Sequence, residues 1–371
     1  MSQLELDVGQ LLWIGYEDRV TPELLARIAA GRVGVTVIFA RNIPRQGDGQ
    51  GANDPIDIEA LRQINAQLAV AGPDGVRNFI AVDQEGGVVQ RLRAPATRWP
   101  PMMTLNAAAH AGHDEQLAVD VGTAVGKELR AVGFDIDFAP ILDVHTNPAN
   151  PIIGDRAFGT TPDVVARRAL AFARGLAAAG MLSCGKHFPG HGDTHTDSHL
   201  ELPRIDHDWA RLRSVELAPF VAAAAAGLPM LMTAHVVFSA LDATVPATLS
   251  RKVMTTLLRE EIGYRGVVVS DDLDMRAIAA HHGVGNAAIA AIRAGCDAIL
   301  LCRDQAHQVQ AEAALISEAR ADAAFATMIA VAAERVRAMK RAHEALQASV
   351  PVEPRSIGCE AHQALATQLR Q

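Results

Sequence analysis

Residues 186–199 gather side chains that can do chemistry. The segment reads Lys-His-Phe-Pro-Gly-His-Gly-Asp-Thr-His-Thr-Asp-Ser-His and contains four histidines, two aspartates and one lysine. Pro189, Gly190 and Gly192 disfavour a helix, so the segment is predicted to be the end of a strand at Lys186-His187 followed by a histidine-rich loop. Because catalytic groups collect on loops that follow buried strands, this loop is the first candidate for an active site.

Three interpretations of the loop remain open. Histidines at every fourth position would share one face of a helix as metal ligands, but the glycines and the proline remove that helix, and no His-Glu-x-x-His motif is present. A metal-dependent hydrolase is therefore the remote alternative, and no metal or cofactor is expected. In the second interpretation, Asp197 orients His199 for proton transfer near neutral pH. In the third interpretation, the loop is structural or the protein only binds a ligand. The carboxylates at the strand ends would then have no function, although burying unpaired charges in a pocket is costly.

The composition of the chain argues against several classes of protein. Its 371 residues are 49% hydrophobic, which is ample for a large core. A net charge of −8 without a basic block argues against a nucleic-acid partner. The first residues do not resemble a signal peptide and no apolar run has the length of a membrane span, so we expect a cytoplasmic protein without a membrane partner. The four scattered cysteines are expected to be buried, reduced thiols.

Short apolar runs alternate with longer amphipathic stretches along the chain. The predicted strands cover residues 11–15, 33–40, 78–83, 135–140, 183–187, 230–235, 266–270 and 298–302. The predicted helices cover residues 22–30, 58–71, 116–131, 162–179, 209–226, 251–261, 287–294, 306–319 and 321–346. This alternation predicts an α/β fold of the (β/α)8 TIM-barrel type, a single domain with a C-terminal helical extension. A doubly wound sheet is less favoured, because no Gly-x-Gly-x-x-Gly motif follows the first strand.

The chain offers no place to divide it into two large domains. Residues 1–348 are predicted to form the catalytic barrel. Residues 349–371 are predicted to form a tail that packs on the barrel or extends from it.

Polar side chains follow five of the predicted strands, at the end where a barrel places its active site. They are Asp83 and the Gln-Glu-Gly-Gly run after it, Asp143 with the later Gly154-Asp155-Arg156, Lys186-His187, His235, and Ser270-Asp271-Asp272. Together they predict a pocket lined by charges of both signs. In the alternative interpretation, Asp155 and Arg156 simply pair with each other on the rim.

Asp271 narrows the choice of chemistry. A glycosidase requires at least a carboxylate and a proton donor that face each other across the pocket. The carboxylate attacks the anomeric carbon, and the donor protonates the leaving oxygen. The usual donor is a second Asp or Glu. In this sequence the best placed donor is His199.

Four segments resemble, in order, the motifs of glycoside hydrolase family 3, specifically its β-N-acetylglucosaminidases. They are residues 82–87 with Gln90-Arg91, residues 153–158, residues 186–192 with Asp197-Ser198-His199, and residues 270–273. The resemblance extends from about residue 10 to about residue 340. It implies a retaining, exo-acting enzyme that removes terminal β-linked N-acetylglucosamine from muropeptide fragments during cytoplasmic peptidoglycan recycling.

The same resemblance implies a role for each site residue. Asp271 would be the nucleophile, His199 the acid/base and Asp197 its orienting partner. The residues implied to bind the sugar are Asp83, Arg91, Arg156, Lys186 and His187. Such groups suit a sugar, because its hydroxyls both donate and accept hydrogen bonds.

Alternatives close to this assignment remain. Some relatives with the histidine use phosphate as the acceptor, so a phosphorylase is one alternative, and a β-glucosidase on the same fold is another. The pair Asp271-Asp272 also resembles the acids of substrate-assisted hexosaminidases. Asp274 adds a further acid nearby, which is expected to face solvent.

Overall fold

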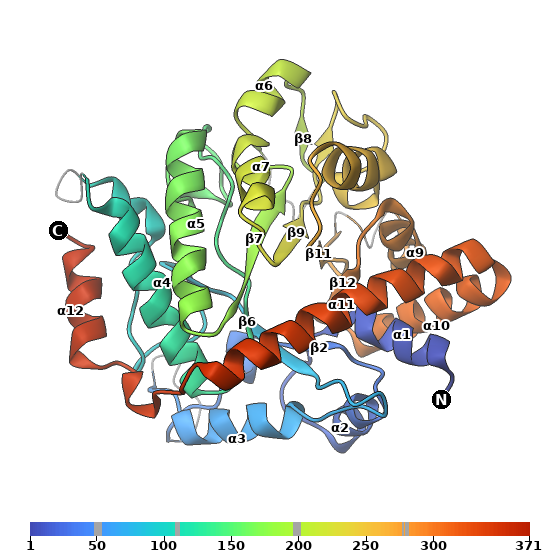
Figure 1. Ribbon diagram of the computed structural model, residues 1–371, viewed down its shortest axis with the longest axis horizontal. Helices are drawn as coiled ribbons and strands as arrows, with labels where there is room; N and C mark the ends of the chain where they lie inside the picture. The colour runs from blue at the N-terminus through green and yellow to red at the C-terminus, as the bar shows by residue number, and fades with distance from the viewer. Residues whose placement is uncertain (48–53, 108–111, 196–201, 277, 279–281) are drawn as a thin grey trace.

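Eight parallel strands form a closed barrel with helices around it (Figure 1). The computed structural model describes residues 1–47, 54–107, 112–195, 202–276, 278 and 282–371. The strand order around the barrel is β1-β12-β11-β9-β7-β6-β3-β2, and β2 pairs again with β1. The predicted (β/α)8 fold is therefore confirmed.

All eight predicted strands are present. A strand of this barrel is covered on both faces, so its residues are apolar in succession, as in Val267-Val268-Val269. The strands are β1 (Leu12–Ile14), β2 (Val35–Ile38), β3 (Phe79–Val82), β6 (Ile136–Asp137), β7 (Leu182–Phe188), β9 (Met230–Thr233), β11 (Val267–Asp272) and β12 (Ala298–Leu301). Two short pairs lie outside the barrel: β4 (Gln84–Gly86) with β5 (Val89–Gln90), and β8 (Arg204–Ile205) with β10 (Val237–Phe238).

The helices that follow the strands lie close to the predicted ranges. They are α2 (Pro22–Ala29), α3 (Ile58–Leu68), α4 (Asp114–Ala131), α5 (Pro162–Ala178), α6 (Trp209–Ser214), α7 (Ala218–Ala225), the π-helix η6 (Lys252–Glu261), α9 (Val284–Ala294), α10 (Gln305–Ala321) and α11 (Ala323–Ser349).

Two helical predictions need correction. The single helix predicted over residues 209–226 is divided into α6 and α7, because Pro219 in the first turn of α7 lacks an N–H and restricts the residue before it. The prediction also lacks α1 (Gln3–Leu11), although Ser2 and Glu5 form the capping box that marks its start.

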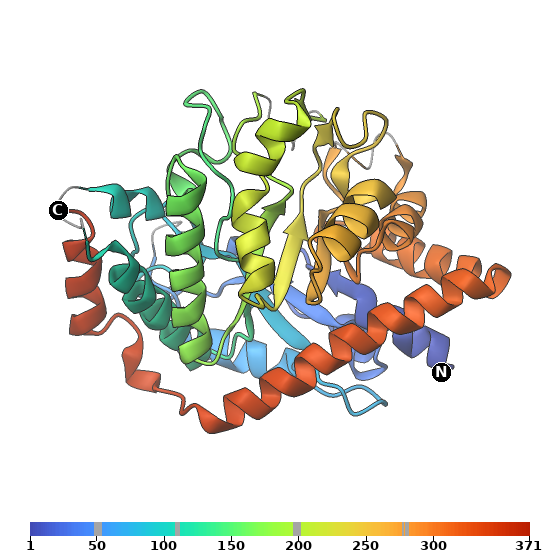
Figure 2. The ribbon, with the colours of Figure 1, turned by 45° about the horizontal axis from the view of Figure 1, so that its top comes forward.

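The barrel interior is packed with side chains and closed at one end. Trp13, Phe79 and Phe138 are fully buried within it, and Val336 and Met339 of α11 complete the same cluster at the amino ends of the strands. Figure 2 shows α11 crossing this end of the barrel. The opposite end, at the carboxyl ends of the strands, is where such a barrel carries its active site.

The end of the chain packs against α4. Glu128 of α4 accepts a hydrogen bond from the backbone N–H of Gly358 at 2.9 Å, and its Oε1 lies 3.0 Å from His362 Nδ1 in α12 (Glu360–Gln368). The two helices lie side by side in Figure 1. A division of the chain at residue 349 stays a prediction. No helix in the described ranges has both the length and the apolar composition needed to cross a membrane.

Candidate active site

A cavity of about 360 Å³ opens at the carboxyl ends of the barrel strands. The structure brings together at this cavity all the predicted site residues that it describes. They are Asp83, Arg91, Arg156, Lys186, His187 and Asp271. Asp197 and His199, predicted as the acid/base pair, lie outside the described residues.

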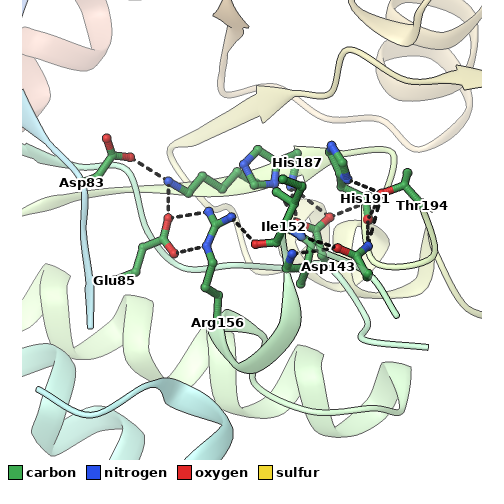
Figure 3. Close-up of polar contacts among 11 residues, drawn as sticks. Asp83, Glu85, Asp143, Ile152, Arg156, His187, His191 and Thr194 are labelled. Carbon is green, nitrogen blue, oxygen red and sulfur yellow. Dashed lines mark hydrogen bonds and ion pairs between the residues drawn. The ribbon is translucent and has the colours of Figure 1, made fainter. Parts of the chain in front are cut away.

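A buried network of charges forms one wall of the cavity (Figure 3). The ammonium of Lys186 lies 2.8 Å from Asp83 Oδ1 and 2.6 Å from Glu85 Oε1. The guanidinium of Arg156 donates to both oxygens of Glu85, at 2.8 and 2.9 Å, and to the carbonyl of Ile152 at 2.9 Å. Arg156 therefore pairs with Glu85 from another strand end and not with Asp155.

The position of Glu85 depends on a tight hairpin. Gly86 has a φ of +97°, and a Cβ at this position would lie 2.6 Å from the carbonyl oxygen of Pro100. Only glycine fits this backbone without strain, so the chain turns directly after Glu85. Gln84 holds the return strand, since its Oε1 accepts from the backbone N–H groups of Arg91 and Leu92 at 2.8 and 3.0 Å.

The network keeps its acids ionised. Burial alone would raise the pKa of Glu85, but Arg156 and Lys186 lower it far below its usual value. Burial likewise opposes ionisation of Asp83, yet Lys186 and Arg91 hold its pKa below the usual value. Burial would also lower the pKa of Lys186, but the two carboxylates raise it. The wall therefore presents fixed charges of both signs, which suits hydrogen bonding to hydroxyl groups.

Arg91 contributes to the same wall more loosely. Its Nη2 lies 3.5 Å from Asp83 Oδ2, and the side chain lines the cavity. Arg91 is therefore placed to support Asp83 and to contact a ligand as well.

An aspartate orients His187. Asp143 Oδ2 lies 2.7 Å from His187 Nδ1, and because a carboxylate only accepts, Nδ1 carries the proton. The backbone N–H groups of His187 and His191 also donate to Asp143. Burial would raise the pKa of Asp143, but His187 and the hydrogen bonds lower it. This pairing fixes the ring and leaves Nε2 as the nitrogen that can meet a ligand.

The start of the His-rich loop is tightly held. Asn150 donates to the carbonyl of His191 at 2.9 Å, and Asn147 donates to the carbonyl of Thr194 at 3.0 Å. A Cβ on Gly192 would lie 1.8 Å from the carbonyl oxygen of Val144, so glycine allows this close approach. Burial, followed by the proximity of His187, lowers the pKa of His191 to about 4. His191 is therefore neutral at neutral pH.

A chain of hydrogen bonds supports the strand end that carries Asp271. The backbone N–H of Asp271 donates to Thr233 Oγ1 at 3.2 Å. Thr248 Oγ1 lies 2.8 Å from Thr233 Oγ1 and 2.8 Å from His235 Nδ1. His235 Nε2 lies 3.1 Å from the carbonyl oxygen of Asp272 and carries the proton, because that oxygen only accepts. These contacts hold the backbone on both sides of the peptide that joins Asp271 to Asp272.

The acids next to Asp271 have separate environments. Asp272 Oδ1 accepts from the backbone N–H groups of Asp274 and Cys302, both at 3.1 Å. Burial, together with the negative charges of Asp274 and Asp271, raises the pKa of Asp272 to about 7. The expectation that Asp274 faces solvent is wrong: its side chain is 2% exposed, pairs with His307 at 2.7 Å and accepts from the backbone N–H of Arg303.

Three residues of this site, Glu85, Asp143 and His191, were expected near the strand ends or in the histidine-rich segment, but the sequence assigned no role to any of them. The role of Glu85 could have been predicted, because two cations expected in a buried pocket, Lys186 and Arg156, require more than one carboxylate. The pairing of Asp143 with His187 could not be predicted from the sequence, since 44 residues separate the two along the chain. Within the described ranges, no three His, Cys, Asp or Glu side chains gather as a metal-binding group.

The sequence of this chain matches the model of a known protein family over most of its length. The model of the glycosyl hydrolase family 3 N-terminal domain matches residues 3–339. The chain belongs to glycoside hydrolase family 3. The eight strands and the charged wall described above all fall within the matched residues.

Individual relatives and solved structures are also similar to this chain. "Beta-hexosaminidase A" of Pseudoalteromonas piscicida is 39% identical over 76% of this chain, and the match spans 47% of that protein. A family 3 β-N-acetylglucosaminidase from Paenibacillus sp. FPU-7 has a TM-score of 0.88 at 36% identity, covering 100% of this chain and 68% of that one. NagZ of Neisseria gonorrhoeae, solved with N-trifluoroacetyl-D-glucosamine, has a TM-score of 0.75 at 33% identity and covers 97% of both chains.

Proposed function

We propose that this family 3 chain is a retaining exo-β-N-acetylglucosaminidase. The observation that carries the proposal is the buried wall of Asp83, Glu85, Lys186 and Arg156, which offers fixed donors and acceptors at the carboxyl ends of the strands. A cavity of about 360 Å³ lies within the size range of small-molecule sites and suits a single sugar unit at a chain end. The names of the relatives above support the acetamido sugar.

In the proposed mechanism the sugar is held by the charged wall. Asp83, Lys186, Arg156 and Arg91 bind hydroxyl and N-acetyl groups, and Nε2 of His187 meets a further hydroxyl. Charge-assisted hydrogen bonds of this kind fix the ring in one orientation. Asp143 keeps the imidazole of His187 in the required tautomer.

Asp271 is the proposed nucleophile. Its carboxylate attacks the anomeric carbon, and the glycosidic bond to the leaving oxygen breaks as His199 donates a proton to that oxygen. His199 then takes a proton from water, which attacks the glycosyl–Asp271 ester and releases the sugar with retained configuration. Asp197 is the proposed partner of His199, because a carboxylate that accepts from one ring nitrogen of a histidine raises the basicity of the other.

The proposed natural substrates are muropeptide fragments of the cell wall, which the enzyme would hydrolyse in the cytoplasm. The single-sugar cavity is consistent with an enzyme that removes one terminal residue from a larger fragment. Incubation with muropeptides and mass spectrometry of the products checks this choice, and release of one N-acetylglucosamine per fragment is the expected result.

The first test compares an aryl β-N-acetylglucosaminide with the matching aryl β-glucoside. A strong preference for the acetamido sugar is expected, and equal or reversed rates would make the β-glucosidase alternative the better one. A repeat with added phosphate separates hydrolysis from phosphorolysis: an unchanged rate and product support hydrolysis.

A slow fluorinated substrate tests the covalent mechanism. The expected outcome is a glycosyl adduct on the peptide that contains Asp271, detected by mass spectrometry. An adduct on another residue, or none at all, would contradict the assignment of Asp271.

A further inference from the structure

Two consecutive acids at the end of β11, Asp271 and Asp272, both line the candidate active-site cavity. In a regular strand, consecutive side chains point to opposite faces, so only one of the two is expected on this side. The proposed mechanism uses Asp271 as the nucleophile and gives Asp272 no part. Asp272 is therefore a second acid at the reacting end of the cavity whose function is open.

A bulge in β11 brings the second acid to the cavity. β11 pairs with its neighbour β12 in the barrel (Figure 1). Val269 is opposite Ala298, whereas Asp272 is opposite Leu300, so β11 contains an extra residue between these two pairs. Such a bulge re-aims a side chain, and bulges are frequent next to active sites. The irregular backbone thus explains how both acids reach one cavity.

One oxygen of the Asp272 carboxyl group is anchored, and the other is accessible. Oδ1 accepts hydrogen bonds from the backbone N–H groups of Asp274 and Cys302, both at 3.1 Å, which holds the carboxyl group against the end of β12. Oδ2 has no hydrogen-bond partner among the described residues, yet it is not one of the polar atoms that packing closes off. Asp272 therefore offers one oriented oxygen to a ligand in the cavity.

The surroundings of Asp272 favour its neutral form. Burial and the charges of Asp274 and Asp271 raise its pKa to about 7, while the two backbone N–H groups oppose this rise. The other titratable or charged groups around it are His235 of β9, the Cys302 thiol, His307 beyond Asp274, and Arg41 and Arg303 of the cavity wall. Near pH 7, about half of the molecules therefore carry Asp272 as a carboxylic acid, whose O–H is a hydrogen-bond donor.

The proposed reaction indicates which atom of the sugar this donor meets. Asp271 attacks the anomeric carbon, and the ring atoms bonded to that carbon are the ring oxygen and C2. The ring oxygen becomes electron-poor in the oxocarbenium-like transition state, so a hydrogen-bond donor there opposes the reaction. The acetamido group on C2 has a carbonyl oxygen that accepts a hydrogen bond, and contacts to the C2 substituent can strengthen in the transition state.

We propose that Asp272 donates a hydrogen bond from Oδ2 to the acetamido carbonyl oxygen of the bound sugar, and that it thereby selects substrates with an acetamido group at C2. This inference rests on the proposed function, because it requires the acetamido sugar to be the substrate. A β-glucoside has a hydroxyl group at C2 and lacks this carbonyl. The hydrogen bond also draws electrons from the carbonyl oxygen and disfavours its own attack on the anomeric carbon, which agrees with Asp271 as the nucleophile.

The ratio of kcat/KM for an aryl β-N-acetylglucosaminide to that for the matching aryl β-glucoside tests the proposal. Asp272→Ala, which removes the donor, should lower this ratio about tenfold or more, because only the acetamido sugar loses a contact. A natural chain without the preference for the acetamido sugar would overturn the proposed function and this inference together. A natural chain with the preference, and an alanine variant that keeps it, would overturn only the assignment of Asp272.

Asp274→Asn is the matched control for a purely structural effect. The Asp274 side chain is 2% exposed, pairs with His307 and is not one of the described residues that line the cavity. Its loss should change kcat/KM for both sugars by the same factor and leave their ratio as in the natural chain. An equal fall of the ratio in Asp274→Asn and Asp272→Ala would assign the effect to the shape of the strand end and overturn the inference.

Asp272→Asn provides a test that keeps both hydrogen bonds at the Oδ1 position and so does not depend on how the alanine variant folds. Its amide NH₂ donates at every pH, whereas Asp272 loses its proton as the pH rises through about 7. Between about pH 6 and 8, kcat/KM of the natural chain for the acetamido sugar should therefore fall about tenfold further than that of Asp272→Asn. Parallel pH profiles of the two proteins would refute the donor role.

Discussion

Glu85 should be the residue of the charged wall on which stability depends most. Its side chain is 3% exposed and accepts three short hydrogen bonds from cations, two from Arg156 at 2.8 and 2.9 Å and one from Lys186 at 2.6 Å. Glu85→Gln keeps the shape but removes the charge, and in either orientation its amide NH₂ faces at least one cationic donor. Breaking a buried ion pair on one side costs about 3–5 kcal/mol, so the free energy of unfolding should fall by about that amount.

Urea denaturation measures this loss of stability. The midpoint should fall while the slope of unfolding free energy against urea stays constant, because the surface exposed on unfolding does not change. The matched control is Glu115→Gln. Glu115 pairs with Arg167 at 2.7 Å, but their side chains are 44% and 49% exposed, so its removal should cost about 0–1 kcal/mol.

The pH dependence of this loss checks its electrostatic origin. The pKa of Glu85 lies below its unfolded value, because Arg156 and Lys186 outweigh the opposing effect of burial. An acid whose pKa is lowered on folding stabilises the protein above its unfolded pKa, about 4.3, and this contribution disappears as the pH falls further. The difference between the natural chain and Glu85→Gln should therefore be constant from about pH 6 to 8 and shrink below about pH 4. A loss no larger than that of the Glu115 control, or a difference that grows at low pH, would refute the reasoning.

Three further predictions concern the proton donor and the acids around the nucleophile. His199→Ala should slow substrates with poor leaving groups far more than activated aryl glycosides, measured as kcat/KM for both, and equal losses would contradict the role of acid. Asp272→Asn should reduce the fall in unfolding free energy between about pH 4 and 7, because a pKa raised to about 7 makes the folded state bind more protons than the unfolded state over that range. Thr248→Val should lower kcat about tenfold with little change in KM, because Thr248 supports the peptide of Asp271 and not the sugar wall; a change confined to KM would contradict this.

The local sequence determined the elements of the barrel. Val267-Val268-Val269 is apolar at every position because both faces of β11 are covered, so the strand could be predicted without knowing its neighbours. The break before α7 follows from Pro219, and the start of α1 follows from the capping box of Ser2 and Glu5. Each of these effects acts over a few residues, which is why the sequence alone is sufficient to find it.

The sequence also placed the reactive groups at strand ends. Asp83, Lys186 and Asp271 each follow an apolar run, and in a parallel barrel the carboxyl ends of all strands meet at one face. Their convergence on one cavity therefore follows from the order of strands along the chain.

Only the tertiary structure decided which charges pair. Arg156 has Asp155 beside it in the sequence but binds Glu85, which lies 71 residues away, and Asp143 holds His187 across 44 residues. The hand and closure of the barrel bring these pairs together, and burial then makes each pairing necessary, because an unpaired charge in the interior is too costly. The same long-range packing sets α11 under the barrel and encloses His343 there without a hydrogen-bond partner in the described chain, which no local pattern could predict.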